Sequence, residues 1–82
     1  MSIEQVTAIV KTLERPRSLQ KLIHSIRRYY PQMTVLVGDD SKQPCSLPGV
    51  EYLRLAADCG ASAGRNRLLE HVTTPYFLQL DD

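Results

Sequence analysis

The feature that most constrains this chain of 82 residues is the alternation of short apolar runs with a helical pattern. Residues 6–11 (VTAIVK) and 34–38 (TVLVG) are short and rich in β-branched residues, which is typical of strands in a sheet. Between them, Pro16 fits the first position of a helix, and apolar residues then recur at helical spacing until Pro31. The pattern predicts a strand, an amphipathic helix and a second strand.

The second half of the chain continues this alternation. Residues 50–55 predict a weaker strand, residues 63–71 a second helix, and the run YFLQL after Pro75 a last strand that we expect to be buried on both faces. Helices that follow the first and third strands favour a mostly parallel sheet with helices on its flanks. If the last strand returns beside the first, the strand order is 3-2-1-4. The predicted fold class is therefore α/β.

Polar residues gather where the predicted strands end. In a parallel sheet of this order, ligands bind beyond the carboxyl ends of the strands, at the switch point between the first and last strands. Five polar residues from three strands fall at this edge: Thr12, Asp39, Asp40, Asp81 and Asp82. This convergence is the main indication in the sequence of a binding site.

Each acidic pair has a structural and a functional interpretation. Asp39 and Asp40, followed by Ser41, can form a turn in which the side chains bond their own backbone, or a carboxylate can accept the N–H of a pyrimidine imide. Asp81 and Asp82 can end a strand in solvent, or they can bind ribose hydroxyls and a divalent cation.

Arginines near the start of the second predicted helix have two interpretations as well. Arg65 and Arg67 can be surface charges, or Arg65 can lie beside a diphosphate, which a helix N-terminus also favours.

Composition and missing motifs exclude several classes of function. The net charge of +1 gives no long-range field that would attract nucleic acid. No apolar run approaches the roughly 20 residues that span a bilayer, and no signal peptide is recognisable. The segment after the first strand reads KTLER, without the glycines of a dinucleotide-binding fingerprint or a P-loop.

Three segments together resemble a known family: VTAIVKTLERPRSLQKLIHSIRRYYP, TVLVGDDS and GASAGRNRLLEHVTTPYFLQLDD. They are similar to GT-A glycosyltransferases of the family-2 type, and most of all to the β-1,4-N-acetylgalactosaminyltransferase branch. In that family a Thr-x-x-Arg segment follows the first strand, a DDS-like segment ends the second, a GRN segment opens a helix and an Asp-rich motif ends the fourth strand. The likeness extends over essentially the whole chain.

The resemblance implies that this part of the family's fold binds a UDP-sugar. Thr12 and Arg15 would border the uridine, Asp39 and Asp40 would hold the uracil ring, and Arg65 would lie near the phosphates. No residue of this chain is implied as catalytic.

The resemblance also implies a metal at the end of the chain. Asp81 would bind ribose or support a divalent cation, Mn²⁺ or Mg²⁺, and Asp82 is the candidate ligand. The family's motif continues to a further acid of the DxD pattern, and its acceptor-binding half and catalytic base lie downstream. Residues 1–82 are therefore expected to be a partial GT-A nucleotide-binding domain, truncated at the DxD-type motif.

The expected function is that of the nucleotide-binding portion of an inverting glycosyltransferase, inactive alone, whose parent transfers a sugar from a UDP-sugar to a saccharide acceptor. A nucleotidyltransferase-like domain and a non-catalytic module that binds nucleotide-sugars are the alternatives. The expected compartment is the cytoplasm for a bacterial parent and the Golgi lumen for a eukaryotic-like one. The open edge of the last strand also predicts self-association.

Overall fold

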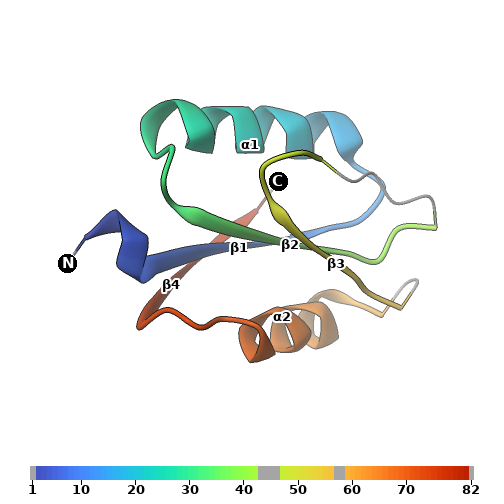
Figure 1. Cartoon of the computed structure of the whole chain (residues 1–82). Helices are drawn as coiled ribbons and strands as arrows, with labels where there is room; N and C mark the ends of the chain where they lie inside the picture. Colours follow the sequence, from blue (N-terminus) through green and yellow to red (C-terminus); the bar gives the residue numbers. More distant parts are fainter. Residues whose placement is uncertain (1, 43–46, 57–58, 82) are drawn as a thin grey trace.

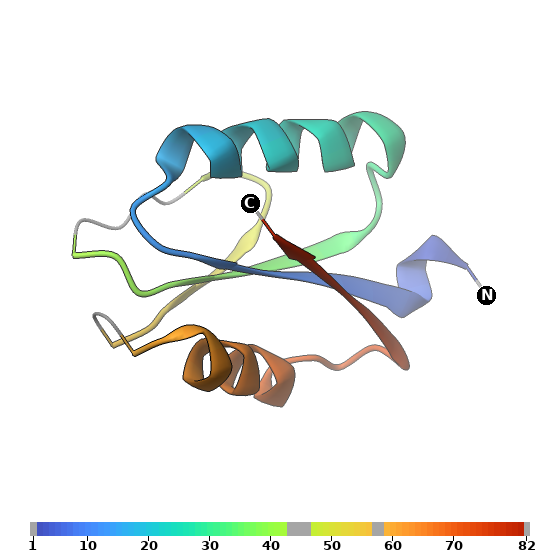
Figure 2. The same ribbon diagram turned by 180° about the vertical axis from the view of Figure 1, so that it is seen from behind.

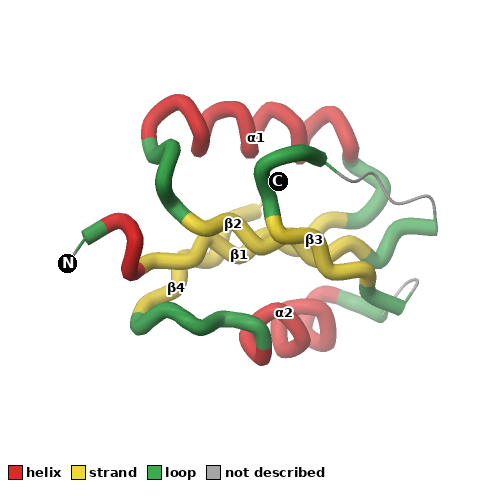
Figure 3. Tube along the Cα trace, in the orientation of Figure 1, coloured by secondary structure: helices red, strands yellow, loops and turns green. Residues whose placement is uncertain are grey.

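Two helices cover opposite faces of a four-stranded parallel sheet in residues 2–42, 47–56 and 59–81, which the computed structural model describes (Figure 1). The elements in chain order are a short 3₁₀ helix at Ile3–Gln5, β1 at Val6–Thr12, α1 at Pro16–Tyr29, β2 at Thr34–Asp39, β3 at Glu51–Arg54, α2 at Ala61–Glu70 and β4 at Tyr76–Asp81. Figure 3 shows the resulting layers, with the sheet between the helices. No helix in these described ranges is long and apolar enough to cross a membrane.

The strand order is β3-β2-β1-β4, so the predicted α/β class and the predicted order are confirmed. β1 lies between β2 and β4 and pairs with both in parallel, so that Ala8 faces Val35 on one side and Leu78 on the other. The chain leaves β1 through α1 on one face and returns to β4 through α2 on the other face. The order of strands therefore reverses at β1, which places the switch point between β1 and β4.

The side chains of β1 alternate between two cores. Ala8 and Val10 belong to the core under α1, together with Leu19, Ile23 and Ile26. Ile9 belongs to the core under α2, together with Leu36 and Leu68. Since β1 is buried on both faces, its central residues Ala8–Val10 are all apolar and lack the polar alternation of a strand that has one solvated face.

β4 is the element for which the prediction was wrong. Its apolar run was expected to be buried on both faces, but Tyr76, Phe77 and Leu78 are 51%, 50% and 46% exposed. Figure 2 shows the reason, since β4 is the edge strand next to β1. An apolar sequence shows that a strand favours burial. Whether its side chains are buried depends on the elements that cover the strand in the fold.

The second helix also differs from its predicted form. It begins at Ala61, two residues before the predicted start at residue 63, and Gly60 with φ +93° precedes it. Leu68 is completely buried, whereas the neighbouring Leu69 is 38% exposed.

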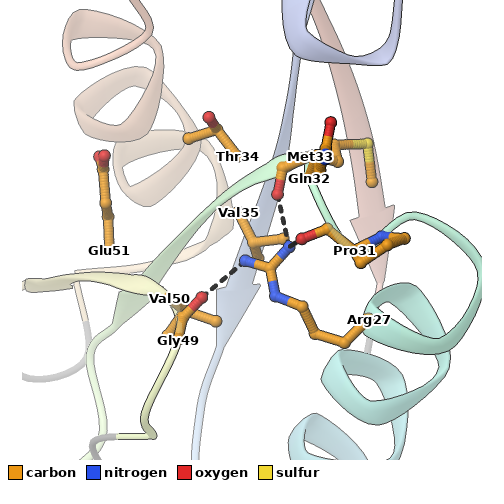
Figure 4. A pocket seen from close by; sticks show the side chains of 9 residues that line it. All are labelled: Arg27, Pro31, Gln32, Met33, Thr34, Val35, Gly49, Val50 and Glu51. Atoms are coloured by element: carbon orange, nitrogen blue, oxygen red, sulfur yellow. Dashed lines mark hydrogen bonds between the residues drawn. The ribbon is translucent and has the colours of Figure 1, made fainter.

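Arg27 has a structural role that its sequence context did not suggest. The pair Arg27-Arg28 resembled a solvated helix end, but the Arg27 guanidinium donates to the carbonyl oxygens of Met33 and Gly49 at 2.5 and 2.6 Å and to that of Pro31 at 3.5 Å (Figure 4). These bonds join the end of α1 to the segments that enter β2 and β3. Charge-assisted bonds of this kind are stronger than neutral ones.

Replacing Arg27 with Met should lower the free energy of unfolding by about 1–2 kcal/mol, because the carbonyls lose a charged donor while most of the aliphatic stem is kept. Urea denaturation measures the change. Arg28→Met, at the exposed neighbouring position, is the matched control and should have almost no effect. Equal effects of the two substitutions would contradict this role for Arg27.

Self-association through the edge of β4 stays a prediction, and the exposed apolar side chains of this strand make it testable. We expect sedimentation velocity to show a concentration-dependent dimer that Leu78→Glu abolishes, since a charge on an edge strand opposes pairing. Leu69→Glu, on the exposed side of α2, is the control. A strictly monomeric profile at high concentration would contradict the prediction.

Candidate functional site

The candidate site lies at the carboxyl edge of the sheet, where β1, β2 and β4 end. Thr12 is paired with Asp39, and Lys11 is paired with Asp81, so these strand ends are adjacent in register. The structure therefore brings together the strand ends that the sequence predicted to converge. The side chains at this edge, however, belong to different faces of the sheet.

Asp39 lies on the α1 face and is held by its neighbours. Its Oδ2 accepts a hydrogen bond from the Tyr52 hydroxyl at 2.6 Å, and its Oδ1 accepts one from the Ser41 N–H at 2.8 Å. The second bond is the local turn that Asp and Ser favour, so the structural interpretation of this motif is present in the molecule. Asp39 is 2% exposed and the adjacent Thr12 is 3% exposed.

Asp40 lies on the α2 face and is completely buried. Its Oδ1 lies 2.5 Å from the Lys11 Nζ, in an ion pair whose lysine side chain is 12% exposed. Its Oδ2 accepts a bond from the Gly60 N–H at 3.3 Å and a weak one from the Cys59 thiol at 3.7 Å. The alternation of side chains along a strand thus separates the two neighbouring acids onto opposite faces.

Asp40 is ionised in spite of its burial. Burial by itself raises the pKa of a carboxyl group, but the hydrogen bond from Lys11, the bond from the Gly60 N–H and the lysine charge outweigh that effect. Together they hold the pKa of Asp40 below its ordinary value of 3.8. The edge of the sheet therefore carries a buried negative charge at neutral pH.

Two glycines let α2 approach this edge. A Cβ at Gly64 would lie 2.9 Å from the Lys11 Cγ and Cε, and one at Gly38 would lie 2.9 Å from a methyl carbon of Leu68. Both distances are shorter than real Cβ contacts, so larger residues would displace either these side chains or the helix. The close approach brings Gly60, at the start of α2, to the Asp40 carboxylate.

Arg65 and Asp81 form a looser pair on the same face. Their nearest atoms lie 3.6 Å apart, and the two side chains are 38% and 91% exposed. A pair this exposed contributes little to stability and can exchange its partners for those of a ligand. Arg15 is separate from this group, because it lies at the start of α1, where its guanidinium reaches the Ser18 hydroxyl at 3.4 Å.

The described residues do not complete a metal site. Among them no group of three or more His, Cys, Asp or Glu side chains is placed to hold a metal ion. Asp81 offers one exposed carboxylate, whereas Asp40 is already paired with Lys11. The predicted metal ligand, Asp82, lies outside the described residues.

Cavities lie at both edges of the sheet. One of about 400 Å³ lies at the amino edge, around Arg27 and Glu51 (Figure 4). Its arginine is engaged with backbone carbonyls, so we do not place the site there. A hollow of about 330 Å³ lies at the carboxyl side, lined by Arg54, Leu55, Ala56, Cys59, Ala63 and Arg67. Cys59 joins this hollow to the Asp40 carboxylate.

Comparisons with known proteins place this edge in a family context. The chain is 47% identical over 79 residues to beta-1,4 N-acetylgalactosaminyltransferase 2 of Mus musculus, and 46% and 44% identical to beta-1,4 N-acetylgalactosaminyltransferase 1 of Homo sapiens and of Rattus norvegicus. Each match covers 94% of this chain. The chain is related to part of these transferases. The resemblance predicted from its motifs is thereby confirmed.

The likeness to the N-acetylgalactosaminyltransferases concerns one segment of each relative. The chain spans 16% of the length of the mouse protein and 15% of the human and rat proteins. No family model matches the chain, and no solved structure matches it significantly.

Sequence reasoning missed Lys11 as a part of this transferase-like edge. The sequence contained an indication of this role, because Lys11 is the one charged residue in the run VTAIVK. It directly follows the buried Val10, so its side chain lies on the opposite face of the strand. An unpaired charge at the end of a buried strand is unfavourable, so an anionic partner is expected. Asp40, at the end of the neighbouring strand, is that partner. Gly60 was missed as well, because a backbone donor leaves no mark in the sequence.

The Asp40 carboxylate should make the free energy of unfolding depend on pH. Because its folded pKa is lowered, its contribution is present above the unfolded value of 3.8 and is lost as the pH falls through the folded pKa. Asp40→Asn should therefore destabilise the chain at pH 7 by about 3 kcal/mol, because it leaves the Lys11 charge unpaired. Urea denaturation should show the difference from the wild type shrinking below pH 3.8. Asp81→Asn, at an exposed position, is the control, and a difference independent of pH would contradict the assignment.

Proposed function

We propose that this chain is the nucleotide-binding portion of an inverting glycosyltransferase, which transfers a sugar from a UDP-sugar donor to a saccharide acceptor. The 44–47% identity to enzymes named as N-acetylgalactosaminyltransferases supports a sugar-transfer function and N-acetylgalactosamine as the sugar. The carboxyl edge of a parallel sheet with a switch point supports a nucleotide site. The observation that carries the proposal is the ionised, buried Asp40 carboxylate, which contacts Cys59 in the lining of the hollow at that edge.

Asp40 is the proposed acceptor for the uracil imide N–H. Its Oδ1 is paired with Lys11, but within the described part of the chain its Oδ2 makes longer contacts, with Gly60 at 3.3 Å and Cys59 at 3.7 Å. Asp40 is completely buried behind the lining of the hollow, so uracil bound there would reach that second oxygen by displacing the Cys59 thiol. Asp39 is assigned to shaping the loop, since Tyr52 and Ser41 hold it on the other face.

Arg65 and Asp81 are the proposed contacts for the rest of the donor. The arginine would attract the diphosphate near the start of α2, and the aspartate would accept hydrogen bonds from the ribose hydroxyls. Their exposed mutual pair, at 3.6 Å, can open for a ligand at little cost. The predicted contacts of Thr12 and Arg15 with the uridine stay a prediction, because Thr12 is 3% exposed and Arg15 lies at the start of α1, away from Asp40.

The chemical step needs groups beyond this edge. In inverting transfer, a carboxylate takes the proton of the acceptor hydroxyl as its oxygen attacks the anomeric carbon. We assign this base to no residue of the described ranges, and we expect the chain to be inactive alone. In our proposal the chain is part of a GT-A domain. The DxD-type motif of that domain follows β4 and includes Asp82 as a Mn²⁺ or Mg²⁺ ligand. A divalent cation there would offset the charge of the diphosphate.

Calorimetric titration with three nucleotides tests the proposal without changing the fold. UDP should bind, whereas ADP and 3-methyluridine diphosphate should bind about tenfold more weakly or not at all, because neither offers the imide N–H to Asp40. We expect Mn²⁺ to change UDP affinity little, since no group of three or more His, Cys, Asp or Glu side chains among the described residues is placed to hold a metal ion.

Circular dichroism should accompany each titration to show that the sample is folded. Equal affinity for UDP and 3-methyluridine diphosphate would contradict the role of Asp40. Equal affinity for UDP and ADP would contradict a uridine site, and no binding by a folded sample would contradict the nucleotide-binding function of this chain. A strong dependence on Mn²⁺ would contradict the incomplete metal site.

A further inference from the structure

We propose that Lys11 is a positioning residue, which fixes one oxygen of Asp40 so that the other is held ready for the nucleobase N–H. This role rests on the proposed nucleotide-binding function and deepens it. The resemblance assigned nothing to Lys11, and the inference comes from the contacts of this side chain alone.

The two oxygens of Asp40 have unequal partners. Oδ1 makes the short ion pair with Lys11 at 2.5 Å, whereas the partners of Oδ2 among the described residues lie at 3.3 and 3.7 Å. A short charged contact to one oxygen prevents the carboxylate from rotating, because rotation would break the pair inside a buried site. The oxygen with the longer contacts is the one whose partners a ligand donor can replace, and because Asp40 is completely buried, that donor has to displace the Cys59 thiol.

The path of the Lys11 side chain is part of the fold. The lysine side chain passes beneath α2, where the Lys11 Cγ and Cε would lie 2.9 Å from a Cβ at position 64. Gly64 leaves room for this path, and any larger residue would have to displace either the lysine or the helix. Space for the lysine is thus built into the contact between β1 and α2.

The surroundings of Asp40 contain other charged and titratable groups, but Lys11 is the cation in contact with its carboxylate. From each neighbouring element these groups are Lys11 on β1, Asp39 on β2, Arg54 on β3, Cys59 before α2, Arg65 on α2 and Asp81 on β4. Arg54 donates to the Asp39 and Leu55 carbonyls, and Arg65 pairs with Asp81. Burial raises the pKa of Asp40, and the Lys11 charge lowers it. Removing Lys11 would therefore allow this pKa to rise.

A purely structural ion pair makes different predictions from a positioning pair. Buried pairs often add little net stability, so stability alone does not separate the two roles. The ionisation of Asp40 and the affinity for UDP are the readouts that separate them, because a structural pair need not affect a ligand.

The test compares Lys11→Met with Lys21→Met, which removes the same charge from an exposed position on α1. Carbon-13 NMR of the Asp40 carboxyl group follows its titration, and calorimetry with UDP follows binding. For Lys11→Met we expect the Asp40 midpoint to move upward and UDP affinity to fall about tenfold or more, with the loss greater at pH 5 than at pH 8. Lys21→Met should match the wild type in both measurements.

Further variants keep the test decisive if Lys11→Met does not fold. Lys11→Gln keeps a donor without the charge, and Gly64→Ala keeps both charges but crowds the lysine. Each should shift the Asp40 titration and weaken UDP binding in the same direction. An unchanged Asp40 midpoint in the folded Lys11 variant overturns the role of Lys11.

Failure of this role and failure of the proposed function can be told apart. UDP binding by the wild type with unchanged affinity in Lys11→Met overturns the role of Lys11 alone. Absence of UDP binding by the folded wild type overturns both proposals.

Discussion

Burial of β1 on both faces is the constraint on which the rest of the structure depends. Its apolar side chains alternate between the core under α1 and the core under α2, while its backbone pairs with β2 and β4. One strand thereby orients both helices and both neighbouring strands. The last residues of β1 also contribute directly to the carboxyl edge, since Lys11 pairs with Asp40, and the Thr12 carbonyl accepts a bond from the Asp40 N–H at 3.3 Å.

The candidate site combines charges whose costs and benefits differ. The Lys11–Asp40 pair is almost completely removed from water, so each charge depends on the other. The Arg65–Asp81 pair is open to solvent, and its mutual attraction is screened. A buried pair beside an exposed one suits a binding edge, in which the first sets a fixed recognition element and the second exchanges partners with a mobile, charged part of a ligand.

Local patterns in the sequence predicted the fold better than they predicted the site. β1, β2 and α1 followed from their apolar spacing, and the parallel sheet followed from the alternation of elements, whereas the strand order also required the last strand to return beside the first. The burial of β4 was wrong because it depends on covering elements rather than on the strand itself. The separation of Asp39 from Asp40 follows from strand alternation once the end of β2 is known, but the partners Lys11 and Gly60 depend on how closely α2 approaches the sheet. That approach is set by Gly38 and Gly64, whose effect is steric and nonlocal.

The placement of Asp39 and Asp40 on opposite faces has a consequence for how this edge tolerates change. Asp39 contacts Tyr52 and the Ser41 backbone, whereas Asp40 contacts Lys11 and Gly60, so the two acids have no partner side chain in common among these contacts. Energetic coupling between substitutions is strongest where residues share partners. Tyr52 and Lys11 bond to different acids on opposite faces of the sheet, so a replacement at one of them leaves the hydrogen bond or ion pair of the other in place.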